Sequence, residues 1–121
     1  MKKKILIVDD SESIREIVGY TLEGDGHEVL KGVDGIDALR HLNGDPIDLV
    51  ITDLNMPNMD GIGLIREIRD HSDYKFVPIL VLTTESQLDK KNEARTAGAT
   101  GWIVKPFVKD KLLGTINKVL R

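Results

Sequence analysis

Five short and mostly apolar segments divide the chain at regular intervals. Where polar and apolar positions do not alternate, such segments predict strands that are covered on both faces of a sheet. Between them, apolar residues recur every three or four positions, which is typical of helices with one buried side. The sequence therefore predicts strands at residues 5–8, 27–31, 48–52, 77–82 and 101–104.

Candidate capping residues mark the ends of several helical segments. Ser13 is followed three positions later by Glu16, which is the spacing of a capping box. Asp34 and Asp60 are suitable N-cap residues for two further helices, and the helix after Asp34 is expected to run through Leu42. The inner faces are expected at Ile14, Ile17, Val18, Thr21 and Leu22 in the first helix and at Leu64, Ile65 and Ile68 in the third.

The helix expected at residues 88–97 differs from the others because most of its positions are charged. Its apolar stripe is thin and consists of Leu88, Ala94 and Ala97. Two interpretations fit this pattern: a helix that is only lightly anchored, or the commoner case of a solvated, charged outer face. A last helix extends to Leu120 and has no good capping residue near Val108.

Strand and helix alternate five times with short connections. This alternation favours an α/β fold with a five-stranded parallel sheet and helices on both faces. A length of 121 residues fits one domain. We expect residues 1–121 to form a single domain with no output domain.

Composition and charge exclude several classes of protein. The absence of cysteine excludes disulfides and thiolate metal sites, and the three histidines are too widely spaced for a zinc site. A net charge of −3 argues against nucleic acid as the main partner. The longest apolar run, residues 77–82, is too short to span a bilayer, and Asp9 and Asp10 interrupt the run that a signal peptide needs. We expect a cytoplasmic protein without membrane insertion.

Polar residues of particular types end or follow four of the five predicted strands. The carboxyl ends of parallel strands share one rim, where open α/β sheets place their ligands. Three carboxylates in one cleft repel each other unless a cation lies among them, and with only oxygen ligands available Mg²⁺ is the expected cation. The rim residues are Asp9 and Asp10 after the first strand, Asp53 after the third, Thr83 after the fourth and Lys105 after the fifth.

Asp53 stands where a carboxylate could act as a nucleophile. Beside Mg²⁺ it could attack phosphorus and form an aspartyl-phosphate. Lys105 would supply a positive charge and Thr83 a hydroxyl for the phosphoryl oxygens. Each residue alone would be interpreted as an ordinary loop residue, but their occurrence at successive strand ends favours a phosphoryl-acceptor site.

These residues and the motifs around them resemble those of bacterial response-regulator receiver domains. The resemblance covers essentially the whole chain in the family's order and is strongest to the stand-alone, CheY-type members. It implies a doubly wound sheet with strand order 2-1-3-4-5, the flavodoxin/CheY-like fold. The motifs are Val8-Asp9-Asp10, Asp53 within Asp53-Leu54-Asn55-Met56-Pro57-Asn58-Met59-Asp60-Gly61, Thr83, and Lys105-Pro106-Phe107.

The resemblance also implies a role for each site residue in a two-component system. Asp53 would be phosphorylated by a histidine kinase or a histidine phosphotransfer protein, with Thr83 and Lys105 in contact with the phosphoryl group. The peptide bond between Lys105 and Pro106 would be cis. The Mg²⁺ ligands would be Asp9 (through water), Asp10, Asp53 and the backbone carbonyl of Asn55.

Signalling, rather than classical enzyme activity, is the implied function, with self-catalysed phosphotransfer and autodephosphorylation. Asn55 and Glu85 stand where the family tunes phosphate loss, and their polar character suggests relatively quick autodephosphorylation. Thr83 and Trp102 occupy switch positions, although Trp102 is equally explained as packing for the fifth strand. The fourth helix, fifth strand and fifth helix would present the switched face to an unknown protein target, with chemotaxis as one candidate pathway.

Two other classes of function remain open on the sequence alone. A haloacid-dehalogenase-type phosphohydrolase also uses Mg²⁺ and an aspartyl-phosphate, but it needs its two acids two positions apart, whereas Asp9 and Asp10 are adjacent. A flavin-binding protein of the same fold would need a phosphate loop after the first strand, where this acidic pair would repel the flavin phosphate. A P-loop nucleotide site is excluded because its motif is missing.

Overall fold

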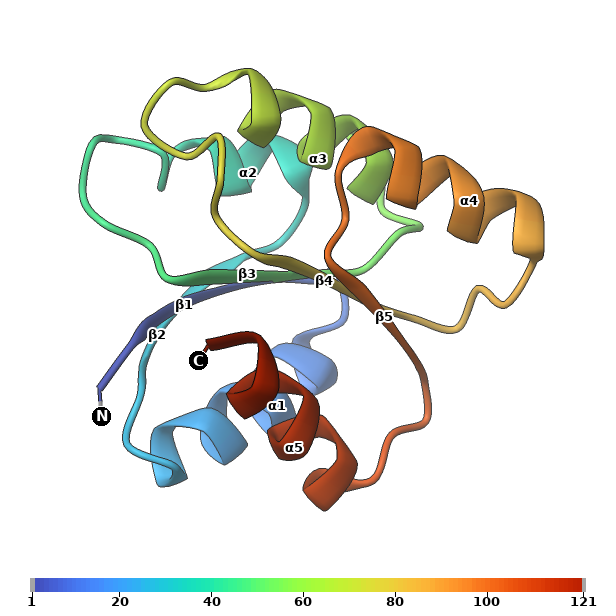
Figure 1. Cartoon of the computed structure of the whole chain (residues 1–121). Helices are drawn as coiled ribbons and strands as arrows, with labels where there is room; N and C mark the ends of the chain where they lie inside the picture. Colours follow the sequence, from blue (N-terminus) through green and yellow to red (C-terminus); the bar gives the residue numbers. More distant parts are fainter. Residues whose placement is uncertain (1, 121) are drawn as a thin grey trace.

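A five-stranded parallel sheet forms the centre of the computed structural model, which describes residues 2–120 (Figure 1). The strand order is β2-β1-β3-β4-β5, which confirms the expected order. Observed strand ends differ from the predicted ones by at most two residues. The strands are β1 (Lys4–Val8), β2 (Glu28–Gly32), β3 (Leu49–Thr52), β4 (Ile79–Thr83) and β5 (Gly101–Val104).

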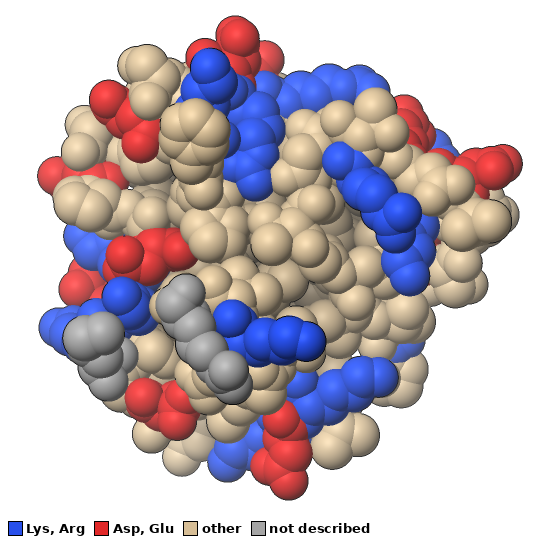
Figure 2. All heavy atoms as spheres, viewed as in Figure 1, with Lys and Arg blue, Asp and Glu red and all other residues tan. Residues whose placement is uncertain are grey.

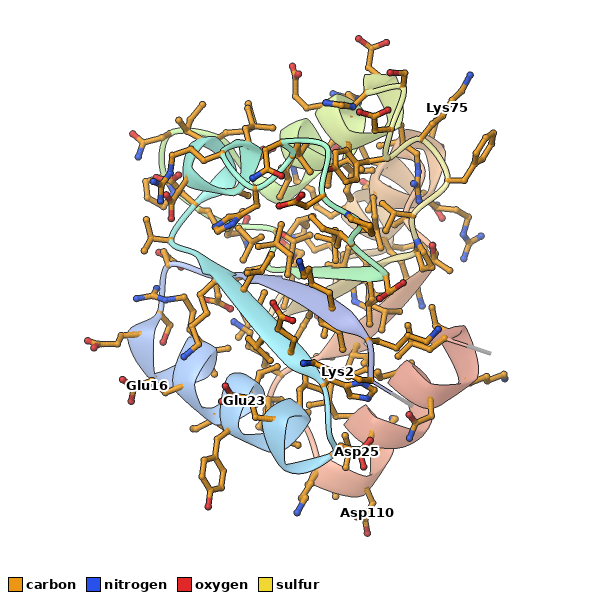
Figure 3. The ribbon with its side chains drawn as sticks, turned by 90° about the vertical axis from the view of Figure 1, so that its left-hand side faces the viewer. Lys2, Glu16, Glu23, Asp25, Lys75 and Asp110 are labelled. Carbon is orange, nitrogen blue, oxygen red and sulfur yellow. The ribbon has the colours of Figure 1, made fainter. Side chains whose placement is uncertain are left out.

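Helices cover both faces of the sheet, as the alternation of elements predicts. One face carries α1 (Glu12–Gly24) and α5 (Lys109–Leu120). The other carries α2 (Gly35–Leu39), α3 (Gly61–Asp70) and α4 (Leu88–Ala97). Seen from the β2 edge, the labelled side chains Glu16 and Asp110 project outward from the two helices on this face (Figure 3).

Two apolar clusters, one on each face of the sheet, make up the core. The central strands β1, β3 and β4 are buried almost throughout, whereas the edge strands β2 and β5 are partly exposed. Side chains alternate between the two faces along a strand, so each central strand contributes to both clusters. Ile5, Ile7 and Ile51 pack toward α1 and α5, and Leu6, Val8 and Val50 pack toward α2–α4.

The start of the first helix differs from the prediction. Ser11, not Ser13, is the N-cap, with extended backbone angles (φ −86°, ψ 116°) and a side chain that accepts from the Ile14 N–H at 3.3 Å. The helix begins at Glu12 because the chain leaves β1 and turns immediately, so Ser13 already lies within the first turn. Ile17 was expected on the inner face but is 54% exposed, since the buried side is centred on Val18 and Leu22.

The second helix is shorter than predicted. Asp34 is its N-cap as expected, but the helix ends at Leu39 rather than continuing through Leu42. Beyond it, the N–H groups of Arg40, His41 and Leu42 each donate to the carbonyl three residues earlier, so the chain tightens into successive turns. Leu42 still packs against the core, which explains why its apolar character suggested a longer helix.

Several other predictions are confirmed. Asp60 caps α3 by accepting from the Gly63 N–H at 2.8 Å, and Leu64, Ile65 and Ile68 are fully buried. The bounds of α4 and β5 agree with the predicted ones. Among residues 2–120, none of the helices has the length and apolar character that crossing a membrane requires.

Surface charges of both signs mix on the face shown in Figure 2, with uncharged surface between them. Some surface charges form exposed pairs between or within helices. Glu93 of α4 lies 3.8 Å from Arg66 of α3 and 3.7 Å from Lys90 of its own helix. Exposed pairs of this kind contribute little to stability because solvent screens them.

Candidate functional site

The carboxyl ends of four strands bring the predicted site residues to one rim of the sheet. Asp53 follows β3, and its N–H donates to the Val8 carbonyl at 2.9 Å, so Asp53 lies level with the end of β1. Lys105 follows β5, and its N–H donates to the Thr83 carbonyl at 2.8 Å. The backbone pairing of the strands therefore fixes where these side chains start.

Lys105 joins the two sides of the rim through its ammonium group. Its Nζ lies 2.7 Å from Asp9 Oδ2 and 3.2 Å from Asp53 Oδ2. The three side chains are largely shielded from water, with exposed fractions of 11% for Lys105, 3% for Asp9 and 11% for Asp53. In this low-dielectric setting, the charge-assisted hydrogen bonds are stronger than they would be at the surface.

Three carboxylates converge at the same point. One oxygen from each of Asp9, Asp10 and Asp53 lies within 4.8 Å of the others, with Asp9 and Asp53 buried and Asp10 exposed. Asp9 Oδ1 accepts from the Ser11 N–H at 2.9 Å, and Asp53 Oδ1 accepts from the Leu54 N–H at 2.6 Å. An oxygen-only cluster with an exposed member suits a hard cation that retains water ligands, which is the behaviour of Mg²⁺.

The buried ionic cluster shifts the pKa of two of its members. Burial raises the pKa of Asp9 above its usual 3.8, and the hydrogen bonds from Lys105 and Ser11 only partly oppose this effect. Burial lowers the pKa of Lys105, but the hydrogen bonds and charges of Asp9 and Asp53 outweigh burial and hold this pKa above its usual 10.5. Lys105 is therefore a firmly protonated cation between two acids.

Thr83 and Trp102 occupy the same side of the sheet. Thr83 is fully buried at the end of β4, and its Oγ1 accepts from the Glu85 N–H at 3.2 Å. Trp102 pairs with Val81 in the register of β4 and β5, and it packs with the cluster on the α4 side. Since Thr83 is two positions after Val81, alternation along the strand places the side chains of Thr83 and Trp102 on one face.

Asn55 and Glu85 lie in the loops that border the rim. Asn55 is exposed two positions after Asp53, and Glu85 is half-buried two positions after Thr83. The Glu85 carboxylate accepts from the Gln87 N–H at 3.2 Å and so lies against its own loop. Both residues therefore border the rim without joining the ionic cluster among the described contacts of residues 2–120.

The loop from Asp53 to α3 is closed at its base. The Gly61 N–H donates to the Leu54 carbonyl at 2.8 Å. Gly61 passes so close to the Asp53 carbonyl oxygen that a Cβ there would overlap it, so a side chain at this position would push the loop away. The Lys105–Pro106 peptide bond at the opposite side of the rim is cis.

Arg15 is a site neighbour that the sequence pattern did not indicate. Its Nη1 donates to the Asp9 backbone carbonyl at 2.7 Å and brings a second cation near the acidic cluster. On the sequence, Arg15 is one of many charged helix residues, and its position one turn into α1 carries no motif. Only the direction in which α1 leaves β1 places it beside the rim.

Comparison with known proteins gives one family and several close structures. The model of the response regulator receiver domain matches residues 5–117. Chemotaxis protein CheY-3 of Vibrio cholerae serotype O1 is 40% identical over 117 residues, which are 96% of this chain and 90% of that protein. The structure of the V. cholerae chemotaxis protein CheY4 has a TM-score of 0.94 and 47% identity, covering 99% of this chain and 100% of that one.

A third similar structure contains a metal ion. It is the receiver domain of the sensor histidine kinase PA1611 from Pseudomonas aeruginosa PAO1, with a magnesium ion coordinated in its active-site cleft. Its TM-score is 0.90 at 27% identity, and the match covers 99% of this chain and 98% of that one.

Proposed function

Because the chain belongs to the response regulator receiver domain family, we propose that Asp53 is the side chain on which it accepts a phosphoryl group. The family and the CheY-type relatives make the chain a response-regulator receiver of a phosphorelay, and they overturn the phosphohydrolase and flavin-binding alternatives. The observation that carries the choice of Asp53 is its position at the end of β3, where its carboxylate lies between the Lys105 ammonium and the adjacent acids Asp9 and Asp10.

The proposed reaction is a transfer between two covalent bonds to phosphorus. A carboxylate oxygen of Asp53 forms a bond to phosphorus while the bond from phosphorus to the donor group breaks. In the transition state, negative charge spreads over the phosphoryl oxygens. Lys105, which already lies 3.2 Å from Asp53, places its positive charge beside them. The Thr83 hydroxyl, buried at the adjacent strand end, is the group that would hydrogen-bond to one of these oxygens.

The residues present fit a bound Mg²⁺. Such an ion would neutralise the carboxylates and the phosphoryl oxygens together. Its proposed holders are Asp10 and Asp53, the backbone carbonyl of Asn55, and Asp9 through a water molecule. The convergence of the carboxylate oxygens of Asp9, Asp10 and Asp53 and the exposure of Asp10 to solvent support this assignment.

The proposed partners follow from the chemistry of the family. A histidine kinase or a histidine phosphotransfer protein would supply the phosphoryl group from a phosphohistidine, whose bond from phosphorus to nitrogen breaks in the step described above. The surface of α4, β5 and α5 would bind a downstream protein after phosphorylation. Similarity to CheY-3 and CheY4 supports chemotaxis as the pathway.

Asn55 and Glu85, which border the rim, would tune the rate at which water removes the phosphate.

Incubation with a small phosphodonor and Mg²⁺, followed by intact-mass measurement, tests the proposal. We expect the wild type to gain the mass of one phosphoryl group in the presence of Mg²⁺, and Asp53→Ala to gain none. Asp45→Ala is a matched control, because Asp45 is exposed and its side chain lies outside the rim. An unmodified wild type, or a fully modified Asp53→Ala, would overturn the assignment of Asp53.

A further inference from the structure

Two loops of different origin are fastened together beside the candidate site. One follows β3 and carries Asn55, and the other joins β2 to α2. The Asn58 side-chain amide donates to Asp34 Oδ2 at 2.6 Å, and the Gly35 N–H donates to the Met59 carbonyl at 3.2 Å. The backbones are so close that a Cβ on Gly35 would lie 2.8 Å from that carbonyl oxygen.

Asn58 adopts a costly backbone conformation to make this contact. Its φ is 69°, and it is the one non-glycine residue with positive φ among residues 2–120. The Met59 N–H donates to the Pro57 carbonyl at 2.7 Å, so Asn58 is the centre of a three-residue turn of a rare and strained kind. Such strain persists only where surrounding contacts impose it, and it is often found beside functional sites.

Asp34 is well placed to hold the loop because its carboxylate is itself fixed. It is 7% exposed, and its Oδ1 accepts from the Asp37 N–H at 2.8 Å as the N-cap of α2. The hydrogen bonds from Asp37 and Asn58 hold the pKa of Asp34 below its usual value, so the acceptor remains ionised at neutral pH. One oxygen of the Asp34 carboxylate therefore caps α2, and the other accepts a hydrogen bond from the neighbouring loop.

We propose that the Asn58–Asp34 contact positions the loop whose Asn55 carbonyl would hold Mg²⁺, and that it thereby sets the affinity for the ion. Asn58 and Asp34 are then positioning residues that do not touch the metal. The loop is fixed at its base by Gly61 and Leu54 and at its tip by this contact, with Asn55 between them. The inference rests on the proposed function, since it concerns the same metal site.

Titration of ¹⁵N-labelled protein with Mg²⁺ alone, followed by NMR chemical shifts, tests the inference without any phosphorylation. Asn58→Gly removes the amide but accepts the positive φ, so the variant should fold. Asp34→Ser keeps a good N-cap residue and removes the oxygen that Asn58 contacts. We expect each variant to weaken Mg²⁺ binding by about tenfold, the lower end of the usual effect of residues that support metal ligands. The double variant should be no weaker than either single variant.

Matched controls separate this role from a general loss of stability. Asn43→Gly makes the same chemical change in an exposed loop, where Asn43 accepts from the Asp45 N–H at 3.1 Å, and it should bind Mg²⁺ like the wild type. Equal Mg²⁺ midpoints for wild type and Asn58→Gly, or additive losses in the double variant, would overturn the inference alone. If the chemical shifts of the wild type do not change on addition of Mg²⁺, the proposed metal site and the inference are both overturned.

Discussion

At the scale of single residues, the rim of the sheet brings together carboxylates that repel each other. Asp9 and Asp53 are buried acids near a third acid, Asp10, and the Lys105 ammonium offsets only part of their charge. Burial raises the pKa of Asp9, and the negative charge of Asp53 adds a smaller effect in the same direction. The folded protein binds a proton at Asp9 more tightly than the unfolded chain does, so the ionised form of Asp9 disfavours folding above its folded-state pKa.

The raised pKa of Asp9 predicts that Asp9→Asn stabilises the metal-free protein. Asparagine keeps an acceptor for the Ser11 N–H without the charge, and Lys105 retains Asp53 as its partner. We expect the free energy of unfolding at neutral pH to rise by about 1 kcal/mol, a typical size for one substitution. The advantage should shrink as the pH falls through the folded-state pKa of Asp9, because the wild-type carboxyl then takes up its proton.

Urea denaturation in the presence of a chelator, at neutral and at acidic pH, measures this difference. Asp10→Asn is the control, because Asp10 belongs to the same cluster but is exposed, so its change should be smaller. A less stable Asp9→Asn at neutral pH would contradict the prediction. Lys105 should not contribute to the pH dependence in this range, because its raised pKa gives a stabilisation that is lost only at alkaline pH.

At the scale of elements, α4 is the helix least attached to the core. Ala94 is its one buried residue, Leu88 is 68% exposed, and the N-cap Gln87 makes no side-chain capping bond. This packing fits both interpretations of its charged sequence, light anchoring and a solvated outer face. The other end of α4 is held by Arg69 of α3, whose Nη2 donates to the Gly98 carbonyl at 2.8 Å.

Arg69 is therefore predicted to be a structural residue rather than a surface charge. Its Nη1 also donates to the Val77 and Lys75 carbonyls, at 2.6 Å and 3.0 Å, so one side chain ties together the segments that precede β4 and β5. We expect Arg69→Gln to lower the free energy of unfolding by about 2 kcal/mol, because several carbonyls lose a charged donor. Hydrogen exchange at the end of α4 should accelerate.

Arg66→Gln on the same helix is the matched control for urea denaturation. Arg66 is 61% exposed, and its Nη2 lies 3.8 Å from Glu93, so its loss should change stability by less than about 0.5 kcal/mol. If Arg69→Gln and Arg66→Gln were equally stable, the hydrogen bonds of Arg69 would not hold α4 in place.

Trp102 of β5 is predicted to report the proposed phosphorylation of Asp53. It borders a pocket of about 90 Å³ beside α4, and it faces the same side of the sheet as Thr83, so movement at Thr83 can change its surroundings. It is the single tryptophan of the sequence, so excitation at a wavelength that only tryptophan absorbs reports on this residue alone. We expect a phosphodonor with Mg²⁺ to quench or shift the emission of the wild type. An equal response in Asp53→Asn would show that the change does not come from phosphorylation.

Some features of the helices and strands could be predicted from the sequence, and others could not. Strands and rim residues could be predicted because buried strands are unbroken apolar runs and their ends are polar. The N-cap Ser11 could not be predicted because Ser11 and Ser13 have the same side chain. The early end of α2 could not be predicted because Leu42 is apolar where it packs against the core, outside the helix. The Arg69–Gly98 and Asn58–Asp34 contacts join residues more than 20 positions apart, so local sequence patterns do not indicate them.

At the scale of the whole molecule, the proposed metal site makes stability depend on Mg²⁺. A ligand that binds only the folded state adds about 1.4 kcal/mol when its free concentration is ten times its Kd. We expect the thermal midpoint to rise with Mg²⁺ in the wild type and to rise less in Asp10→Asn, which lacks a proposed ligand. Sodium chloride at matched ionic strength is the control for screening. A wild-type midpoint that does not respond to Mg²⁺ would contradict the proposed site.

The contact between Lys105 and Asp9 spans 96 positions of the sequence, and this has a consequence for the protein during its synthesis. A growing chain exposes Asp9 and Asp53 to the cell long before β5 has left the ribosome. Until β5 joins the edge of the sheet, Asp53 lacks the Lys105 ammonium that lies 3.2 Å from it in the folded protein, so under the proposed function we expect an unfinished chain to react poorly with phosphodonors. Under the proposed function, we therefore expect phosphorylation only after β5 has been translated and has paired with β4.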